Sequence, residues 1–481
     1  MADGFYQFDG VELAALIARG ETTATELLDA SLARAALLNP ILNAITVMAE
    51  DAARSSITAG LPDGPMTGVP FLLKDLGAEA VALPTTNGST LFKDKIHTYD
   101  SEIYLRVKAA GLVTFGRTAS PEFGIGPVTE ASANGAPTRN PWNTEHTSGG
   151  SSGGAAAAVA AGIVPVAHGS DGGGSVRIPA SSCGLVGFKP TRARLPDGPV
   201  AGEGWAGMAI DGFLTRSLRD TAVLLDATAG PDLGVPYWPP PMDEDYVTAM
   251  GQTPRTLKIA YLTRSFSGDK VHDECRRAVE NTAATLDGLG HHVDEFKGSI
   301  DILAMMQAWT NIVACGTALN VHAKSKDPTV YEPQLDGVTR GAIKLAEGVS
   351  GADYLKAIND VHAFGRQMAG HLANIDVLLT PTLAEPPAIV GRFKPVNEDF
   401  LDYRMGPDGV FAYSPFTAAF NASGQPAVSL PLHWTDNDLP VGVHLAASFG
   451  DDSLLMNLAA QLETAMPWRE KQLSLIRKLA S

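Results

Sequence analysis

The chain has few cysteines and no recognisable metal-binding pattern. Its three cysteines, Cys183, Cys275 and Cys315, are widely separated among 481 residues, and no two of them form a C-x-x-C pair. An odd number of distant cysteines predicts neither a disulfide framework nor a zinc knuckle. The eleven histidines lack the H-E-x-x-H spacing of zinc hydrolases, so the sequence argues against a metallohydrolase.

Basic residues and long apolar runs are also scarce. Lys and Arg total 36 against 53 Asp and Glu, which gives a formal net charge of −17. This charge disfavours phosphate backbones and anionic lipids, so we expect neither nucleic acid nor a membrane as a partner. The uncharged run 153–167 is too short and too weakly apolar to cross a bilayer. Residues 1–20 lack a basic segment followed by an apolar one, so we expect no signal peptide and a cytoplasmic location.

The sequence does contain enough apolar material for a large core and a repeated order of helix and strand. Hydrophobic residues make up 45% of the chain, which excludes disorder. Residues 69–73 predict a buried strand, and residues 104–111 predict a helix that leads into a strand at 112–115. Similar helical or strand-like segments recur at 220–230, 256–262 and 275–293. This alternation predicts an α/β fold in which helices cover a central sheet.

A first cluster of glycine and serine, 148–154, runs directly into a row of alanines. A flexible loop at a helix N-terminus exposes free amides that bind anions or hold an unusual backbone, and a plain turn of the chain is the alternative. Residues 149–153 also fit G-x-S-x-G, the nucleophile elbow of α/β-hydrolases, with His444 among the downstream histidines. The elbow needs an apolar strand before the serine, whereas residues 140–147 are polar and contain Pro141. This hydrolase alternative is therefore disfavoured.

A second cluster, 169–179, places Gly172, Gly173, Gly174 and Ser175 in a row. Because three of these residues have no Cβ, their amides can turn toward one point, as an oxyanion hole requires. Ser175 would then stand beside its own stabilising donors, and a tight turn with a surface serine is the alternative. We expect the neighbouring His168 to be packed or hydrogen-bonded rather than to act as a base.

Lys74 ends the apolar run 71–73. A lysine at the mouth of a buried strand commonly extends its ammonium group to water. If it is enclosed instead, desolvation lowers its pKa and lets the neutral amine act as a base. Such a base would matter near a serine, because serine is a weak nucleophile until a neighbour takes its proton.

Taken together, these segments resemble the amidase signature family. The matching blocks are Gly68-Val69-Pro70 to Lys74-Asp75, Pro121-Glu122-Phe123-Gly124, Asn140-Pro141-Trp142-Asn143, both glycine clusters, Gly184 to Thr191, Gly212 to Ser217, Asp376 to Pro381, and Asn421 to Pro431 with Gly424-Gln425-Pro426. The resemblance implies a single amidase signature domain over 1–481, with core motifs in 60–230 and 376–470 and a variable, substrate-shaping region in 231–375. It also implies an α/β fold with a central mixed β-sheet covered by α-helices on both faces.

The resemblance further implies the catalytic residues. In the family's Ser-cisSer-Lys triad, Ser175 corresponds to the nucleophile and Lys74 to the base. Ser151 corresponds to the bridging serine, which follows a cis peptide bond, here with Gly150. Neither a metal nor a cofactor is implied.

The residues around the nucleophile have implied roles as well. Gly172, Gly173, Gly174 and Ser175 correspond to the oxyanion hole, and Asp171 and Arg177 resemble residues that brace this loop. Family members commonly carry threonine or another side chain where this chain has Gly172, which predicts either a looser loop or wider access for a bulky acyl group.

Substrate contacts are predicted at two positions. Ile125 falls where family members line the substrate channel. Cys315 lies in the variable region and is predicted either as a substrate contact or as a packed helix cysteine.

The function implied is hydrolysis of the C–N bonds of linear amides, including aryl and acyl amides, with carbamates (a urethanase activity) also within the family's range. The partner would be a small amide or carbamate, and the oligomeric state, a homodimer included, stays open. Two alternatives remain at this point. One is a glutamine-hydrolysing amidotransferase subunit, and the other is a binding protein with a silent triad.

Overall fold

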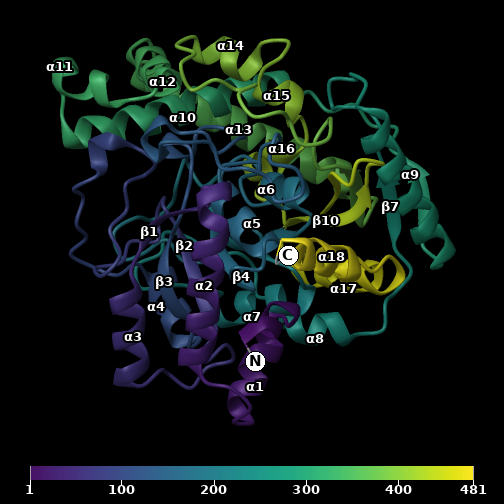
Figure 1. The fold of residues 1–481 in the computed structure, drawn as a ribbon. Coiled ribbons are helices and arrows are strands. Elements are labelled where there is room, and N and C mark those ends of the chain that lie inside the picture. The colour runs from purple at the N-terminus through teal and green to yellow at the C-terminus, as the bar shows by residue number, and fades with distance from the viewer. Residues whose placement is uncertain (1, 480–481) are drawn as a thin grey trace.

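The structure, a computed structural model, describes residues 2–479 and centres on one sheet of eleven strands (Figure 1). The order across the sheet is β1-β3-β2-β4-β6-β5-β10-β11-β9-β7-β8. The strands are β1 (Ile45–Met48), β2 (Pro70–Lys74), β3 (Val113–Thr118), β4 (Val166–Asp171), β5 (Val186–Lys189), β6 (Ile210–Thr215), β7 (Lys258–Tyr261), β8 (His292–Glu295), β9 (Val377–Pro381), β10 (Ala427–Trp434) and β11 (Pro440–Ala447). β2 runs parallel to β3 and β4, and β7 runs parallel to β8 and β9, whereas the other neighbours are antiparallel.

Helices account for a large part of the remaining chain. They are α1 (Gly10–Ala18), α2 (Ala24–Leu42), α3 (Glu50–Ala59), α4 (Glu102–Ala109), α5 (Gly153–Ala160), α6 (Arg177–Cys183), α7 (Leu218–Thr228), α8 (Tyr246–Gly251), α9 (Asp273–Gly288), α10 (Leu303–Lys324), α11 (Pro328–Tyr331), α12 (Gly337–Glu347), α13 (Gly351–Leu372), α14 (Phe400–Met405), α15 (Val410–Tyr413), α16 (Thr417–Ser423), α17 (Asp452–Ala465) and α18 (Arg469–Lys478). Within residues 2–479, no helix combines the length and apolar character that a bilayer crossing requires.

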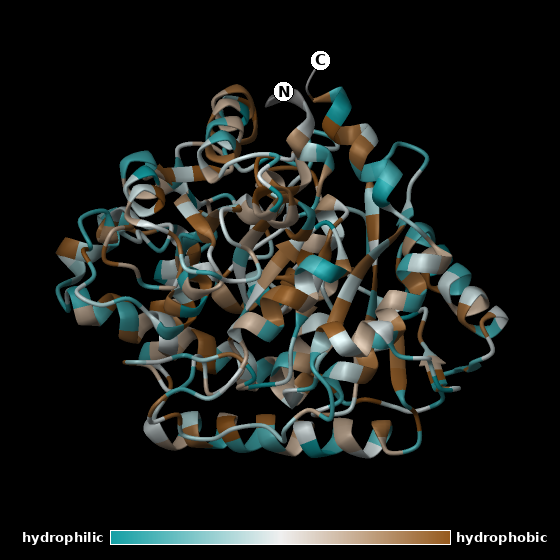
Figure 2. Ribbon diagram, turned by 90° about the horizontal axis from the view of Figure 1, so that it is seen from below, coloured by the Kyte–Doolittle hydropathy of each residue, from teal (hydrophilic) through white to brown (hydrophobic). Residues whose placement is uncertain are grey.

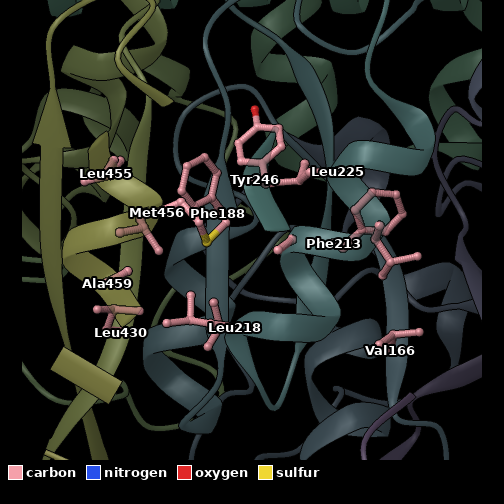
Figure 3. Packing of buried hydrophobic residues seen from close by; sticks show 14 of the residues in the cluster. Val166, Phe188, Phe213, Leu218, Leu225, Tyr246, Leu430, Leu455, Met456 and Ala459 are labelled. Carbon is pink, nitrogen blue, oxygen red and sulfur yellow. The ribbon is translucent and has the colours of Figure 1, made fainter. Parts of the chain in front are cut away.

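One face of the sheet packs against α1, α4, α7, α8, α9 and α17, and all of these elements contribute to one buried cluster. Figure 3 shows part of it, where Phe188 and Phe213 of neighbouring strands lie near Tyr246 and Leu225. The rings of Phe188 and Tyr246 meet edge to face, with centroids 5.8 Å apart. Such burial removes a large apolar area from water and is the main force that holds these helices on the sheet.

The opposite face is covered by two further sets of helices. α2, α5 and α6 pack over the strands of the N-terminal half, and α10, α12, α13, α14 and α16 form a second group that gathers at the top of Figure 1. Apolar strands therefore lie between helical layers, and polar helix faces point outward (Figure 2). The mixed sheet with helices on both faces confirms the fold that the resemblance implied.

The strands and helices predicted from local patterns are largely present. The predicted strand at 69–73 is β2, and the helix and strand predicted over 104–115 are α4 and β3. The segments at 220–230 and 256–262 contain α7 and β7, and 275–293 contains most of α9 and the start of β8. Region 231–375 supplies one edge of the sheet, β7 and β8, and the helices α8 to α13.

Candidate active site

Lys74 is placed by the alternation of side chains along β2. Phe71 and Leu73 belong to the core on one face of the sheet, and Leu72 belongs to the core on the other face, beside α5. Because side chains alternate between faces, Lys74 points to the same side as Leu72. Its side chain is completely buried, so the enclosed arrangement is the one observed.

Two hydroxyl groups contact the Lys74 amine. Nζ lies 2.7 Å from Ser151 Oγ and 3.0 Å from Ser170 Oγ, with the Ser170 carbonyl oxygen at 3.4 Å. The peptide bond between Gly150 and Ser151 is cis, as the resemblance implied. The amine thus contacts hydrogen-bonding groups, and within residues 2–479 no carboxylate is paired with it directly.

Burial sets the protonation of this amine. Desolvation lowers the pKa of Lys74 to about 7, and the more distant carboxylates of Asp211 and Asp171 offset part of that effect. A large fraction of Lys74 is therefore uncharged near neutral pH. A neutral amine 2.7 Å from a serine hydroxyl can accept its proton.

The two glycine clusters meet beside this lysine. The Ser152 N–H donates to the Ser175 carbonyl at 3.2 Å, which ties the loop before α5 to the loop before α6. Ser151 and Ser175 both line the same cavity. Among residues 2–479, no partner lies within hydrogen-bond distance of the Ser175 hydroxyl, which is partly exposed.

The glycine loop presents a set of amides without acceptors. The carbonyl groups of Asp171, Gly172 and Gly174 accept hydrogen bonds from Asn421 Nδ2, Trp309 Nε1 and the Ile178 N–H. In a trans peptide the N–H points away from the carbonyl, so these contacts orient the N–H groups of residues 172, 173 and 175. Within the described chain these three amides have no acceptor, and they form a concave donor set next to Ser175 that suits a developing oxyanion.

Gly174 departs from its predicted role. Its N–H donates to Asp171 Oδ1 at 2.8 Å, and its φ is +125°. The sequence placed this amide in the oxyanion hole, but the Asp171 carboxylate folds back onto the loop and occupies it. The structure therefore leaves Gly172, Gly173 and Ser175 as the available donors.

Gly172 neither loosens the loop nor widens the cavity. A Cβ at this position would lie 2.5 Å from a ring carbon of Trp205. The indole of Trp205 therefore fills the space of the missing side chain. The Trp205 ring also packs edge to face on the ring of Trp309, with centroids 5.7 Å apart. Both expectations for this glycine are wrong, because an aromatic residue from elsewhere compensates for it.

Asp171 and Arg177 brace the loop as predicted. Arg177 donates to both carboxylate oxygens of Asp171 at 2.9 Å, and both side chains are fully buried. Burial alone would raise the pKa of Asp171, but the Arg177 guanidinium and the Asn421 amide hold it below its ordinary value. Arg177 also lies 3.0 Å from His444 Nε2, so this histidine supports the arginine and not a serine.

Neither His168 nor the G-x-S-x-G match has the contacts of a conventional serine hydrolase. The Lys74 backbone N–H donates to His168 Nδ1 at 3.3 Å, which places the ring proton on Nε2, facing Asp211 Oδ1 at 3.1 Å. His168 is buried and hydrogen-bonded, as expected. The serine of the G-x-S-x-G match, Ser151, contacts a lysine and follows no strand, so the nucleophile-elbow alternative is not supported.

A cavity of about 310 Å³ opens in front of these groups. It is lined by Ser151, Ser170 and Ser175, by Trp205, and by Thr317 and Asn320 of α10. Lys74 is not among the lining residues, but Ser151 and Ser170, whose hydroxyl groups it contacts, are. A larger cavity of about 450 Å³ lies near the N-terminal helices and contains none of the predicted catalytic residues.

The two predicted substrate contacts lie outside the lining of this cavity. Ile125 is buried and borders a separate small cavity, although its neighbour Gly124 lines the main one. Cys315 is on α10, two residues before Thr317, and positions two apart face different sides of a helix. Contact of these two residues with substrate stays a prediction that the cavity does not support.

Several residues of the site had no sequence signal of their own. Ser170 lies in the second glycine cluster, but only the fold brings its hydroxyl to Lys74. Trp205 comes from the loop between β5 and β6, and Trp309 from α10, more than 130 residues beyond the glycine loop it holds. No group of three or more His, Cys, Asp or Glu side chains within residues 2–479 is arranged to hold a metal ion.

Known proteins resemble this chain in sequence and in fold. A family model described as Amidase matches residues 26–456. The chain is 35% identical over 471 residues to a 6-aminohexanoate-cyclic-dimer hydrolase of Paenarthrobacter ureafaciens, and the match covers 96% of this chain and 95% of that protein. The solved structure of 6-aminohexanoate cyclic dimer hydrolase complexed with substrate aligns with a TM-score of 0.90 at 32% identity, over 98% of this chain and 100% of that one. A bacterial aryl acylamidase of the amidase signature enzymes aligns with a TM-score of 0.87 at 27% identity, over 98% of both chains.

Proposed function

This chain belongs to the amidase signature family of amidohydrolases, and on that premise we propose that it hydrolyses linear amides through a Ser175–Ser151–Lys74 relay. The observation that carries the proposal is the position of the Lys74 amine. It is fully buried, has a pKa of about 7 and lies 2.7 Å from Ser151 Oγ. Ser151 in turn lines the cavity in which Ser175 stands beside free amides.

Acylation begins when the Ser175 hydroxyl turns toward Ser151. Neutral Lys74 accepts the proton of Ser151, and Ser151 accepts the proton of Ser175, whose oxygen then bonds to the amide carbonyl carbon. The carbonyl oxygen becomes an oxyanion and is held by the N–H groups of Gly172, Gly173 and Ser175.

The intermediate then collapses and breaks the C–N bond. The proton stored on Lys74 returns through Ser151 to the departing nitrogen, so the amine leaves neutral and Ser175 carries an acyl ester. Water attacks this ester with the relay again taking a proton, and the carboxylic acid product leaves while Ser175 regains its hydrogen. No step needs a histidine.

The proposed substrates are small amides. The relatives are described as a 6-aminohexanoate-cyclic-dimer hydrolase and an aryl acylamidase, so aliphatic amides and anilides are the first compounds to assay. A cavity of about 310 Å³ has the size of a typical small-molecule site. Carbamates and esters belong in the same assay, because acyl transfer to serine is the same first step.

A fluorophosphonate probe tests the nucleophile directly. We expect the wild-type protein to be labelled and Ser175→Ala to be unlabelled and inactive on the panel. Ser148→Ala is the matched control, because Ser148 is a buried serine of the first glycine cluster that contacts neither Lys74 nor the cavity. Equal labelling of wild type and Ser175→Ala would refute the assignment. Ammonia release from glutamine, with no other compound of the panel cleaved, would identify an amidotransferase subunit instead.

A further inference from the structure

One wall of the cavity carries an excess of negative charge. Its lining residues include the acids Glu79, Asp197 and Asp211 and a single base, Lys95. Asp197 lies in the loop between β5 and β6, Asp211 lies at the start of β6, and Ser175 lines the same cavity. The Lys95 ammonium lies 5.5 Å from the ring centroid of Phe92 and, within the described chain, forms no ion pair with any of these acids.

Asp197 is one of two lining acids whose carboxylates have no partner within the described chain, and Glu79 is the other. Two nearby carboxylates are engaged: Asp211 faces His168 at 3.1 Å, and Asp232 accepts from the Gly198 N–H at 2.6 Å. Among residues 2–479, no hydrogen bond or ion pair reaches the Asp197 carboxylate. A partly buried carboxylate in a cavity normally has such a partner, so the cavity itself is where its partner would bind.

A second unpartnered group lies on the same wall. Ser101 is only 4% exposed, lines the cavity, and its Oγ has no hydrogen-bond partner. The Glu102 N–H donates to the Gly198 carbonyl at 2.9 Å, which joins the start of α4 to the Asp197 loop. The Ser101 N–H donates to the Glu79 carbonyl at 2.8 Å. Ser101 and Asp197 therefore offer two acceptors from adjacent segments of one wall.

The electrostatics of this wall favour a cation. Burial, together with the negative charges of Asp211, Asp232, Glu203 and Glu79, raises the pKa of Asp197 to about 8. A positive group bound beside Asp197 would relieve this repulsion and restore the ionised carboxylate. An amide nitrogen or a hydroxyl group would not supply that charge.

We propose that Asp197 and Ser101 form a subsite for an alkylammonium group of the substrate, so that this enzyme prefers amides whose chain ends in a protonated primary amine. An ammonium group has three donors and no acceptor, which matches one carboxylate and one hydroxyl oxygen without competing donors. One part of this inference rests on the proposed function, namely that the ammonium group belongs to an amide substrate. The binding of an alkylammonium group can be measured independently.

The first test compares charged and uncharged substrates at about pH 9, where Asp197 is ionised and an alkylamine is still protonated. One pair, 5-aminopentanoyl and pentanoyl 4-nitroanilide, carries the charge on the acyl side. The other pair, N-(5-aminopentyl)acetamide and N-pentylacetamide, carries it on the amine side. We expect wild type to prefer the charged member of at least one pair in kcat/KM, by about tenfold.

Asp197→Asn should abolish that preference. The variant is expected to fold, because it removes a carboxylate whose ionisation the site opposes and keeps the side-chain shape. Asp63→Asn is the matched control, because Asp63 is exposed and outside the cavity. A preference of the same size in wild type and Asp197→Asn, or no preference in wild type, would overturn the proposal.

A binding measurement separates this proposal from the proposed function. Pentylammonium should raise the melting temperature of Ser175→Ala, and the shift should be lost in Ser175→Ala/Asp197→Asn. Equal shifts in the two variants, or no shift in either, would refute the subsite. If no amide is cleaved by wild type but pentylammonium binds in an Asp197-dependent way, the hydrolase proposal fails and the ammonium subsite stands.

Discussion

The regions around Lys74 and Lys189 look alike until their contacts are compared. Both lysines end a strand, both are buried, and burial lowers the pKa of each to about 7. The Lys74 amine contacts the hydroxyl groups of Ser151 and Ser170, which line the cavity. The Lys189 amine donates to the carbonyl oxygen of Pro190 at 2.7 Å and lies outside the cavity lining.

The comparison shows that a lowered pKa identifies an enclosed amine and not its use. A base needs a neighbour with a proton to give, and a carbonyl oxygen has none. Lys189 is surrounded by the buried charges of Arg177, Asp171 and Asp452, which makes it part of the support beneath the glycine loop. Perturbed pKa values mark candidate sites, and the contacts decide among them.

Removing each amine gives the largest expected difference between the two regions. Lys74→Met should lower kcat by about 10³-fold, because the relay loses its terminal base. Lys189→Met, the matched substitution, should keep kcat within about tenfold of wild type, because no reacting proton passes through it. Steady-state assays on a cleaved anilide measure both. Similar losses in the two variants would mean that the lysines are not functionally distinct.

The pH dependence of activity should report only Lys74. Protonated Lys74 cannot accept a proton, so kcat/KM should rise with pH and level off above about 7. At about pH 5 we expect roughly a hundredfold lower kcat/KM than on the plateau, one factor of ten per pH unit. Lys189→Met should show the same curve. If the rise of kcat/KM with pH disappeared in Lys189→Met, the titrating group would be Lys189 and the prediction would be wrong.

The hydroxyl contact of Ser170 should have a smaller effect. Ser170→Ala removes one hydrogen bond to the Lys74 amine, and the expected loss in kcat is about tenfold or less. The midpoint of the kcat/KM profile should also move, since the environment of the amine changes. Ser148→Ala is again the control and should move neither quantity. An unchanged midpoint in Ser170→Ala would show that this contact does not tune the base.

Stability should respond to pH in the same way at both lysines, and this is the smallest expected effect. Between about pH 7 and the ordinary lysine value of 10.5, the unfolded chain binds a proton that the buried amine does not. Wild-type stability therefore falls as pH decreases through this window. Relative to wild type, the melting temperatures of Lys74→Met and Lys189→Met should improve from pH 10 to pH 7. A relative melting temperature that does not change with pH in either variant would contradict the shared burial effect.

Much of the site could be predicted before any fold was known. Lys74 follows an apolar strand pattern, and Ser151 and Ser175 lie in glycine clusters whose amides suit a charged intermediate. The resemblance to a family then connected these three positions, including the cis bond before Ser151, which the structure contains. Local pattern alone left open whether Lys74 was enclosed, because enclosure depends on what packs over the strand.

Other features depended on contacts between distant segments. Gly174 was expected to face an oxyanion, but its amide is used by Asp171. The absence of a side chain at Gly172 does not leave open space, because the ring of Trp205 occupies it. Region 231–375 offered no template, yet α10 supplies Trp309, which fixes the Gly172 carbonyl.

The sequence by itself determined the α/β class, the placement of apolar strands and the positions of the two glycine clusters, because strand periodicity and glycine-rich turns are local properties. Only the tertiary structure decided that an amine at position 74 touches a hydroxyl at 151, and that Ser101 and Asp197 share a cavity wall. These residues are 77 and 96 positions apart in the chain, and such distances close only when the sheet and its covering helices bury a common core.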